Sequence, residues 1–352
     1  MSSTHNKWVD YSTGLCIALF VVMQSAFGIA GTSGEPHWMQ FVARWAQPIA
    51  LPVLFVIAGM FLPRTLFGSK STFFDRKVLR FVYFYLVWMV IQTTTLHFLS
   101  AGSANQHLIE SLALGLVQPT AGLWILPLLA MFAVTAWLVR LVSPKKILFA
   151  AALLQIVHAA GLVQTGAILI DAFAQYFVFY FVGYQGASLM RHFASRLNDR
   201  TQDVVSALVI WAAINTTLVI QGTESLPVIS LILGLAGAVA IIALGVLLAQ
   251  SGRLQVLHYI GRNHLTIYTG YFVPLAIAQV ILLNRTFAPE PGLTSLAVAI
   301  AAITLPLVVY GLLRVTPLKV LYRRPKALRL KGSKLARSGQ LIGQSYDTAE
   351  EA

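Results

Sequence analysis

The chain has 352 residues, of which 57% are hydrophobic and 11% are charged, with a mean hydropathy of +0.75 and a net charge of +13. Soluble domains carry about a quarter of charged residues, so this composition excludes a soluble globular protein. Apolar runs of about 18 to 25 residues recur along the whole chain, which predicts an all-α integral membrane protein. The single cysteine, Cys16, cannot form an internal disulfide.

We predict a bundle of ten transmembrane helices joined by short loops rich in turn residues. In chain order the expected spans are 11–30, 45–63, 78–98, 122–142, 146–161, 166–190, 204–221, 226–250, 264–283 and 294–314. The fifth span is the shortest. The first apolar run is long enough to cross a bilayer and no small-residue cleavage site ends it, so we do not expect a cleaved signal peptide.

The basic residues predict the orientation of this bundle. With the N-terminus in the cytoplasm, 23 of the 25 Lys and Arg residues fall on the cytoplasmic side, and only Arg44 and Arg285 fall outside. An even number of spans then leaves both termini cytoplasmic. We expect a membrane domain over 1–315 and a basic juxtamembrane tail over 316–352, partly disordered. Its position next to the last span favours contact with anionic headgroups over nucleic acid.

Polar residues inside the spans are the candidates for function, because hydrocarbon satisfies none of their hydrogen bonds. Gln24 lies well inside the first span, and Thr13 lies eleven residues earlier. The two positions are about 20° out of phase on a helix, so they share one face about 16 Å apart. Asp171 lies one turn into the sixth span, while His97 and His158 lie at the outer ends of spans three and five. Asp171 is equally interpreted as an interfacial carboxylate in reach of water, and for His97 and His158 the interfacial interpretation is the favoured one.

No pair of histidines or carboxylates has the spacing of metal ligands, so no metal is expected. No glycine-rich phosphate loop is present either.

Five stretches, in order, resemble the integral-membrane acyltransferase family 3, whose members include O-acetyltransferases of surface polysaccharides. Residues 8–25 resemble its opening pattern WxDxxKGxxIxLVVxxHS, and 50–62 resemble a proline followed by FFxxSGxFL. Residues 73–88 resemble its basic turn into an aromatic third span, and 122–132 its LWFxxxLL pattern. Residues 259–274 resemble the late pattern LGxxSLxIYLxH. The expected span count agrees with the family too.

The resemblance implies an activity at the cytoplasmic membrane of a bacterium. An acyl group, often acetyl from acetyl-CoA on the cytoplasmic side, passes to a hydroxyl of a surface glycan or lipid-linked sugar. The family pattern has a basic residue near the start of the first span and a histidine eleven positions later, which serves as base or relay. Imidazole suits that task because its pKa lies near neutrality.

In this chain the two family positions are Thr13 and Gln24, and neither carries the family's residue. A carboxamide forms hydrogen bonds but cannot take up a proton at physiological pH. Other departures follow the same trend. Ala58 stands where the family commonly has serine, and Gln47, Ala50 and Val53 stand where related sequences often have Arg, Arg and Asp. Gln24 is close in size to histidine, so it preserves packing at a site whose usual chemistry is missing.

Two cytoplasmic basic regions, 64–80 and 253–262, are candidates for the phosphates of an acyl-CoA, although topology alone also accounts for their charge. The residues that we expect to contact the acyl-CoA are Arg76, Lys77, Arg80, Arg262 and Asn263.

Three hypotheses stay open. The first is an acyltransferase whose base is His97, His158 or Asp171. The second is a catalytically inactive homologue that binds, scaffolds or translocates an acyl donor or glycan precursor. The third is an unrelated small-solute transporter. It is the least favoured because transporters often have internal repeats and none is evident here. If Gln24 occupies a vacated catalytic position, we expect it to line a cavity that is reachable from outside.

Overall fold

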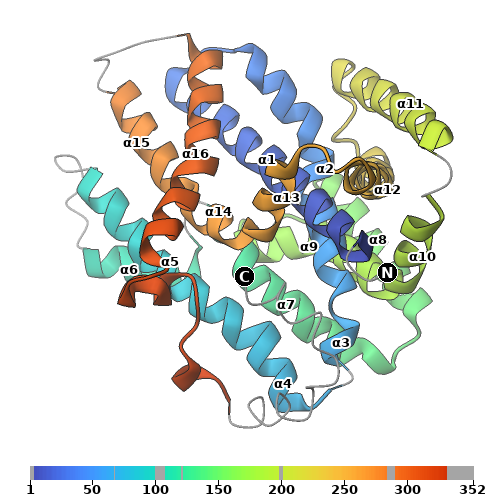
Figure 1. Cartoon of the computed structure of the whole chain (residues 1–352), viewed down its shortest axis with the longest axis horizontal. Helices are drawn as coiled ribbons and strands as arrows, with labels where there is room; N and C mark the ends of the chain where they lie inside the picture. Colours follow the sequence, from blue (N-terminus) through green and yellow to red (C-terminus); the bar gives the residue numbers. More distant parts are fainter. Residues whose placement is uncertain are drawn as a thin grey trace.

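The structure, a computed structural model, describes residues 4–66, 68–99, 108–119, 122–197, 201–283 and 290–330. Throughout these residues the regular secondary structure is helical, without a β-strand (Figure 1). The elements in chain order are α1 (Thr4–Ser33), α2 (Trp38–Met60), α3 (Pro63–Leu66), α4 (Lys70–Phe74), the π-helical turn η1 (Asp75–Leu79), α5 (Arg80–Leu99), α6 (Leu108–Val117), α7 (Ile125–Leu138), η2 (Val139–Leu141), α8 (Pro144–Ala159), α9 (Ile168–Gln185), α10 (Ala187–Arg196), α11 (Thr201–Ile220), α12 (Pro227–Ser251), α13 (Gln255–Arg262), α14 (His264–Gly270), α15 (Phe272–Leu283), α16 (Pro291–Leu313), η4 (Pro317–Leu321) and η5 (Lys326–Leu328).

The all-α class is confirmed, and a helix lies at each predicted span. Within the described residues, seven helices are long and apolar enough to cross a membrane: Lys7–Ser33, Trp38–Leu66, Lys70–Leu99, Thr201–Ile220, Pro227–Ser251, His264–Leu282 and Pro291–Leu313. The helices at the fourth, fifth and sixth expected spans are shorter, with 14 residues in α7, 16 in α8 and 18 in α9. The count of ten spans and the cytoplasmic termini stay predictions.

Helix α1 is the centre of the bundle. It crosses the middle of the molecule and packs against α2, α12, α13 and α16 (Figure 1). Ile17, Phe20 and Val21 in its middle are buried. Because α1 is surrounded by other helices, the polar residues of its inner faces meet protein rather than lipid.

Glycines allow the helices next to α1 to approach backbone to backbone. A Cβ atom on Gly183 of α9 would overlap the carbonyl oxygen of Val56 on α2. In return, a Cβ atom on Gly59 of α2 would overlap the carbonyl oxygen of Tyr180 on α9. In lipid there is no hydrophobic driving force between helices, so their association depends on close van der Waals packing, which small residues at the crossing allow. The α2–α9 pair therefore depends on both glycines.

The segment 316–330 folds back against η1 and α5. The guanidinium of Arg324 forms an ion pair with Asp75, and its Nη1 also donates to the Asp75 carbonyl oxygen at 2.8 Å. These two side chains are only 8% and 5% exposed. Further along, Trp88 Nε1 donates to the carbonyl oxygen of Leu321 at 3.1 Å. The first part of the predicted tail thus packs on protein, whereas its remainder, 331–352, lies outside the described residues.

We predict that Gly183→Val lowers the melting temperature of the purified protein in detergent. The added methyl groups force α2 and α9 apart, at a cost of about 1–3 kcal/mol. Gly311→Val is the matched control, because a Cβ atom at that position meets nothing within 4 Å. Equal melting temperatures for both variants would show that the crossing is not a constraint.

We also predict that Arg324→Ala destabilises the protein by about 3–5 kcal/mol, because it leaves the Asp75 carboxylate buried without its guanidinium. Arg323→Ala, which removes an exposed arginine next to it, should have little effect. Thermal unfolding of both variants in the same detergent tests the difference. Similar unfolding would mean that the 316–330 segment is not anchored at Asp75.

Candidate functional site

Gln24 points into the bundle. Its side chain is half-buried on α1, and its Nε2 donates a hydrogen bond of 3.2 Å to the hydroxyl of Tyr271. Tyr271 directly follows α14 and is 1% exposed. One N–H of the carboxamide that hydrocarbon could not satisfy therefore bonds to a buried phenol from the other end of the chain.

Tyr271 is a site residue that the sequence interpretation missed. When the late family pattern LGxxSLxIYLxH is set in register by Gly261, Ile267 and Tyr268, its final histidine falls on Tyr271. The signal was thus present in the pattern, but only the structure reveals its partner. Two positions at which the family pattern has histidine are in hydrogen-bond contact here, and they hold Gln24 and Tyr271.

The turn before α7 lies directly on this pair. Gly122 has a φ of +97°, and a Cβ atom there would overlap the hydroxyl of Tyr271, so the position requires glycine. The Tyr268 hydroxyl donates to the Gly122 carbonyl oxygen and accepts from the backbone N–H of Ile125 at 3.1 Å. On the other side, the ring of Phe20 meets that of Tyr271 edge-on at 5.3 Å. The pair is therefore held between α1, α14 and the turn at 122–125.

The other end of α1 is charged. Thr13, the family's basic position, is 7% exposed and lies one turn from Asp10. The Asp10 carboxylate lies 3.2 Å from Nε2 of His258 on α13, and Arg262 is close enough to interact with it electrostatically. Gly14 of α1 lies against the Leu257 carbonyl oxygen of α13. A cluster of Asp10, His258 and Arg262 thus lies one turn from Thr13.

The predicted donor contacts are only partly brought together. Arg80, at the start of α5, interacts electrostatically with His264, which is two residues from Arg262 at the junction of α13 and α14. Asn263 is used locally, because its side chain donates to the Tyr259 carbonyl oxygen at 2.9 Å. Arg76 and Lys77 lie on the adjoining π-helical turn η1. Across the described residues, no group of three or more His, Cys, Asp or Glu side chains is arranged to hold a metal ion.

Asp171 and His158, two of the predicted substitute bases, lie near each other. Asp171 accepts hydrogen bonds from the backbone N–H and hydroxyl of Thr165, each at 2.9 Å, and from the N–H of Gly166 at 3.0 Å. His158 interacts electrostatically with this carboxylate, and its Nδ1 lies 2.9 Å from the Val163 carbonyl oxygen. Asp171 therefore fixes the loop before α9, whatever else it does.

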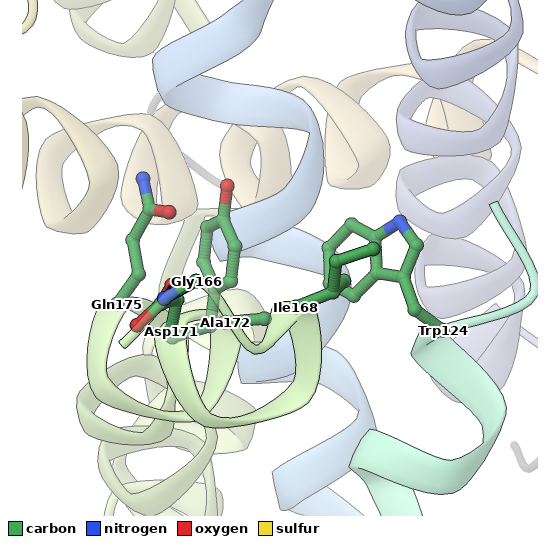
Figure 2. A pocket seen from close by; sticks show the side chains of 7 residues that line it. Trp124, Gly166, Ile168, Asp171, Ala172 and Gln175 are labelled. Atoms are coloured by element: carbon green, nitrogen blue, oxygen red, sulfur yellow. Dashed lines mark hydrogen bonds between the residues drawn. The ribbon is translucent and has the colours of Figure 1, made fainter. Parts of the chain in front are cut away.

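A pocket of about 290 Å³ opens beside Asp171 (Figure 2). Its walls come from α9, from Gly166 just before α9 and from Trp124, and neither Gln24 nor Thr13 lines it. His97 also lies elsewhere, in the last turn of α5, where its ring is 6.0 Å from that of Phe98. That Gln24 lines a cavity reachable from outside stays a prediction.

Comparison with known proteins decides the family. The family model for acyltransferase family 3, described as an acyltransferase domain, matches residues 6–311. The chain belongs to acyltransferase family 3. No curated protein and no solved structure matches it significantly. The match runs from α1 into α16, so the family domain contains the apolar helices, and this acyltransferase-family chain is an integral membrane protein.

We predict that Tyr271→Phe lowers thermal stability by about 0.6–1.7 kcal/mol, the range for hydrogen bonds between helices in membranes, because the Gln24 amide loses its acceptor. Tyr310→Phe is the control, since the Tyr310 ring packs against that of Tyr322 and its hydroxyl forms no hydrogen bond with another described residue. Thermal unfolding in matched lipid nanodiscs measures both. Equal stability would mean that the pair contributes nothing to the fold.

Proposed function

We propose that this protein is a binding member of acyltransferase family 3 that lacks the family's histidine-mediated acyl transfer. It holds an acyl-CoA donor at the cytoplasmic side of a bacterial inner membrane and a hydroxyl-bearing glycan or lipid-linked sugar at the other side. The observation that carries this proposal is the 3.2 Å hydrogen bond between Gln24 and Tyr271, at two positions where the family pattern has histidine.

The chemistry of the Gln24–Tyr271 pair explains why we propose binding without acyl transfer. Transfer of an acyl group to a hydroxyl needs a group that accepts the hydroxyl proton, and a positioned base contributes about 10²- to 10⁴-fold to the rate. A carboxamide does not titrate, and a phenol is ordinarily neutral at pH 7. The two side chains also satisfy each other, so both replacements preserve packing while removing the proton acceptor.

A donor site is supported by the charges at the junction of α13 and α14. Arg80 on α5 interacts electrostatically with His264, which is two residues from Arg262 at the end of α13, and guanidinium groups suit phosphate. Arg76 and Lys77 extend the same positive region along η1, and Asn263 caps α13. We therefore assign the phosphates of acyl-CoA to this region as part of the proposal.

Acyl transfer itself is the second candidate, and one observation favours it. His158 and Asp171 lie close enough to interact electrostatically, which brings an imidazole and a carboxylate into one region, although no hydrogen bond between the described residues joins them. Against it, both groups already bind backbone of the loop 163–166. Family membership leaves the hypothesis of an unrelated transporter without support.

The test uses purified protein in lipid nanodiscs. We expect acetyl-CoA to raise the melting temperature, while the wild type neither hydrolyses acetyl-CoA nor acetylates glycans. The triple variant Thr13→Lys, Gln24→His, Tyr271→His should gain slow hydrolysis, because it restores the proton acceptor and the cation. The matched control Gln24→Asn should stay inactive.

Turnover by the wild type that Ala at His97, His158 or Asp171 abolishes would overturn the proposal in favour of acyl transfer. Absence of any thermal response to acetyl-CoA would contradict the proposed acyl-CoA site. Spectrophotometric release of free CoA separates these outcomes from binding.

A further inference from the structure

One face of α9 forms the wall of the pocket beside Asp171. Ile168, Asp171, Ala172, Gln175 and Tyr176 follow the i, i+3, i+4, i+7, i+8 spacing of a single helix face, and all five line the pocket. Trp124 and Gln175 stand on opposite sides of it, with Ile168 between them (Figure 2). Its volume of about 290 Å³ is at the small end for ligand pockets, so it suits one ring rather than a nucleotide.

Three polar groups of this wall have no protein partner. The amide of Gln175, the indole N–H of Trp124 and the hydroxyl of Tyr176 form no hydrogen bond with any residue of the described chain, and all three residues are half-buried. Half-buried polar groups that line a cavity are available to a ligand. Between them they offer both donors and acceptors.

The charge of the pocket limits what binds. Asp171 is its single ionisable acid, and three donors from Thr165 and Gly166 hold the carboxylate in place, which leaves room on its oxygens for one further donor. No Lys or Arg lines the pocket, so it disfavours phosphate or carboxylate ligands. A cation would leave the N–H and O–H donors of Trp124 and Tyr176 unmatched.

The aromatic groups provide a flat apolar surface. The rings of Trp124 and Tyr176 are stacked with centroids 6.0 Å apart and planes 23° apart, and Phe55 supports Tyr176 from α2 at 5.2 Å. A ligand that matches this pocket has an apolar face and hydroxyls that both donate and accept. We infer that the pocket binds the uncharged, hydroxyl-rich ring of a sugar, with Trp124 against the ring and Gln175 and Asp171 on its hydroxyls.

This inference rests on the proposed function and assigns its acceptor side to particular residues. Trp124 belongs to the turn that begins at Gly122, the residue in direct contact with Tyr271. The backbone of Ile125, next to Trp124, is bonded to Tyr268. The sugar pocket is thus connected to the Gln24–Tyr271 pair by the short turn from Gly122 to Trp124, on the side predicted to face outward. Asp171 is then a ligand-binding residue rather than a base.

Saturation-transfer NMR on the full-length protein in nanodiscs tests the inference. The probes are methyl glycosides of glucose, galactose, mannose and N-acetylglucosamine, with choline chloride and sodium phosphate as charged comparators. We expect transfer to at least one neutral glycoside and not to the charged probes. Gln175→Ala and Trp124→Phe should each weaken that binding by about 2- to 12-fold, the equivalent of one net hydrogen bond. Trp124→Phe keeps an aromatic ring, so it limits the risk of misfolding.

Gln221→Ala, an exposed glutamine at the end of α11, is the control and should bind like the wild type. Failure of every neutral glycoside, preference for choline, or binding unchanged by both pocket variants would overturn the inference. Acetyl-CoA melting shifts and CoA release on the same samples keep the two proposals apart. Loss of sugar binding with acetyl-CoA still bound and intact rejects the pocket alone. Acetyl-CoA turnover together with Gln175-dependent sugar binding rejects the binding-only function alone.

Discussion

Hydrocarbon offers no hydrogen-bonding partner, so a polar side chain within the bundle gains stability when it finds a partner in the protein. Gln24 is the clearest case in this chain, because it lies in the central helix and reaches Tyr271 across 247 residues of sequence. This contact fixes Gln24 inside the bundle next to Tyr271. Gly122, which lies directly against Tyr271, ties the pair to the turn that carries Trp124.

If the two family positions have lost their histidines as proposed, the contact also explains why the fold persists. A single change from histidine to a smaller apolar residue would leave its partner buried and unsatisfied, which costs about 1–3 kcal/mol. Replacement at both positions by groups that bond to each other avoids that cost. The neighbouring replacements behave differently: Ala50 and Val53 lie in the apolar core with 0% exposure, whereas Gln47 is exposed. Core packing has thus taken over part of the interior.

The sequence predicted what depends on local pattern. Hydropathy gave the all-α membrane class and a helix at each expected span, and motif order gave the family. It did not predict what depends on long-range contact: the partnership of Gln24 with Tyr271, the ion pair of Arg324 with Asp75, or the loop bonds of Asp171. Asp171 illustrates the reason. A carboxylate near a span end has the same sequence signature whether it anchors a loop, lines a pocket or takes up a proton.

The polar groups along α1 fit the proposed binding function better than acyl transfer. At the end predicted to face the cytoplasm, Asp10, His258 and Arg262 keep a charged cluster, even though Thr13 one turn away is neutral. In the outer half of α1, the Gln24–Tyr271 pair is neutral. The adjoining pocket has polar side chains without a hydrogen-bond partner among the described residues. Unpaired polar groups in a membrane protein are costly. Their presence in the two proposed binding regions, beside a proposed chemical centre that holds no proton acceptor, is what the proposed binding role requires.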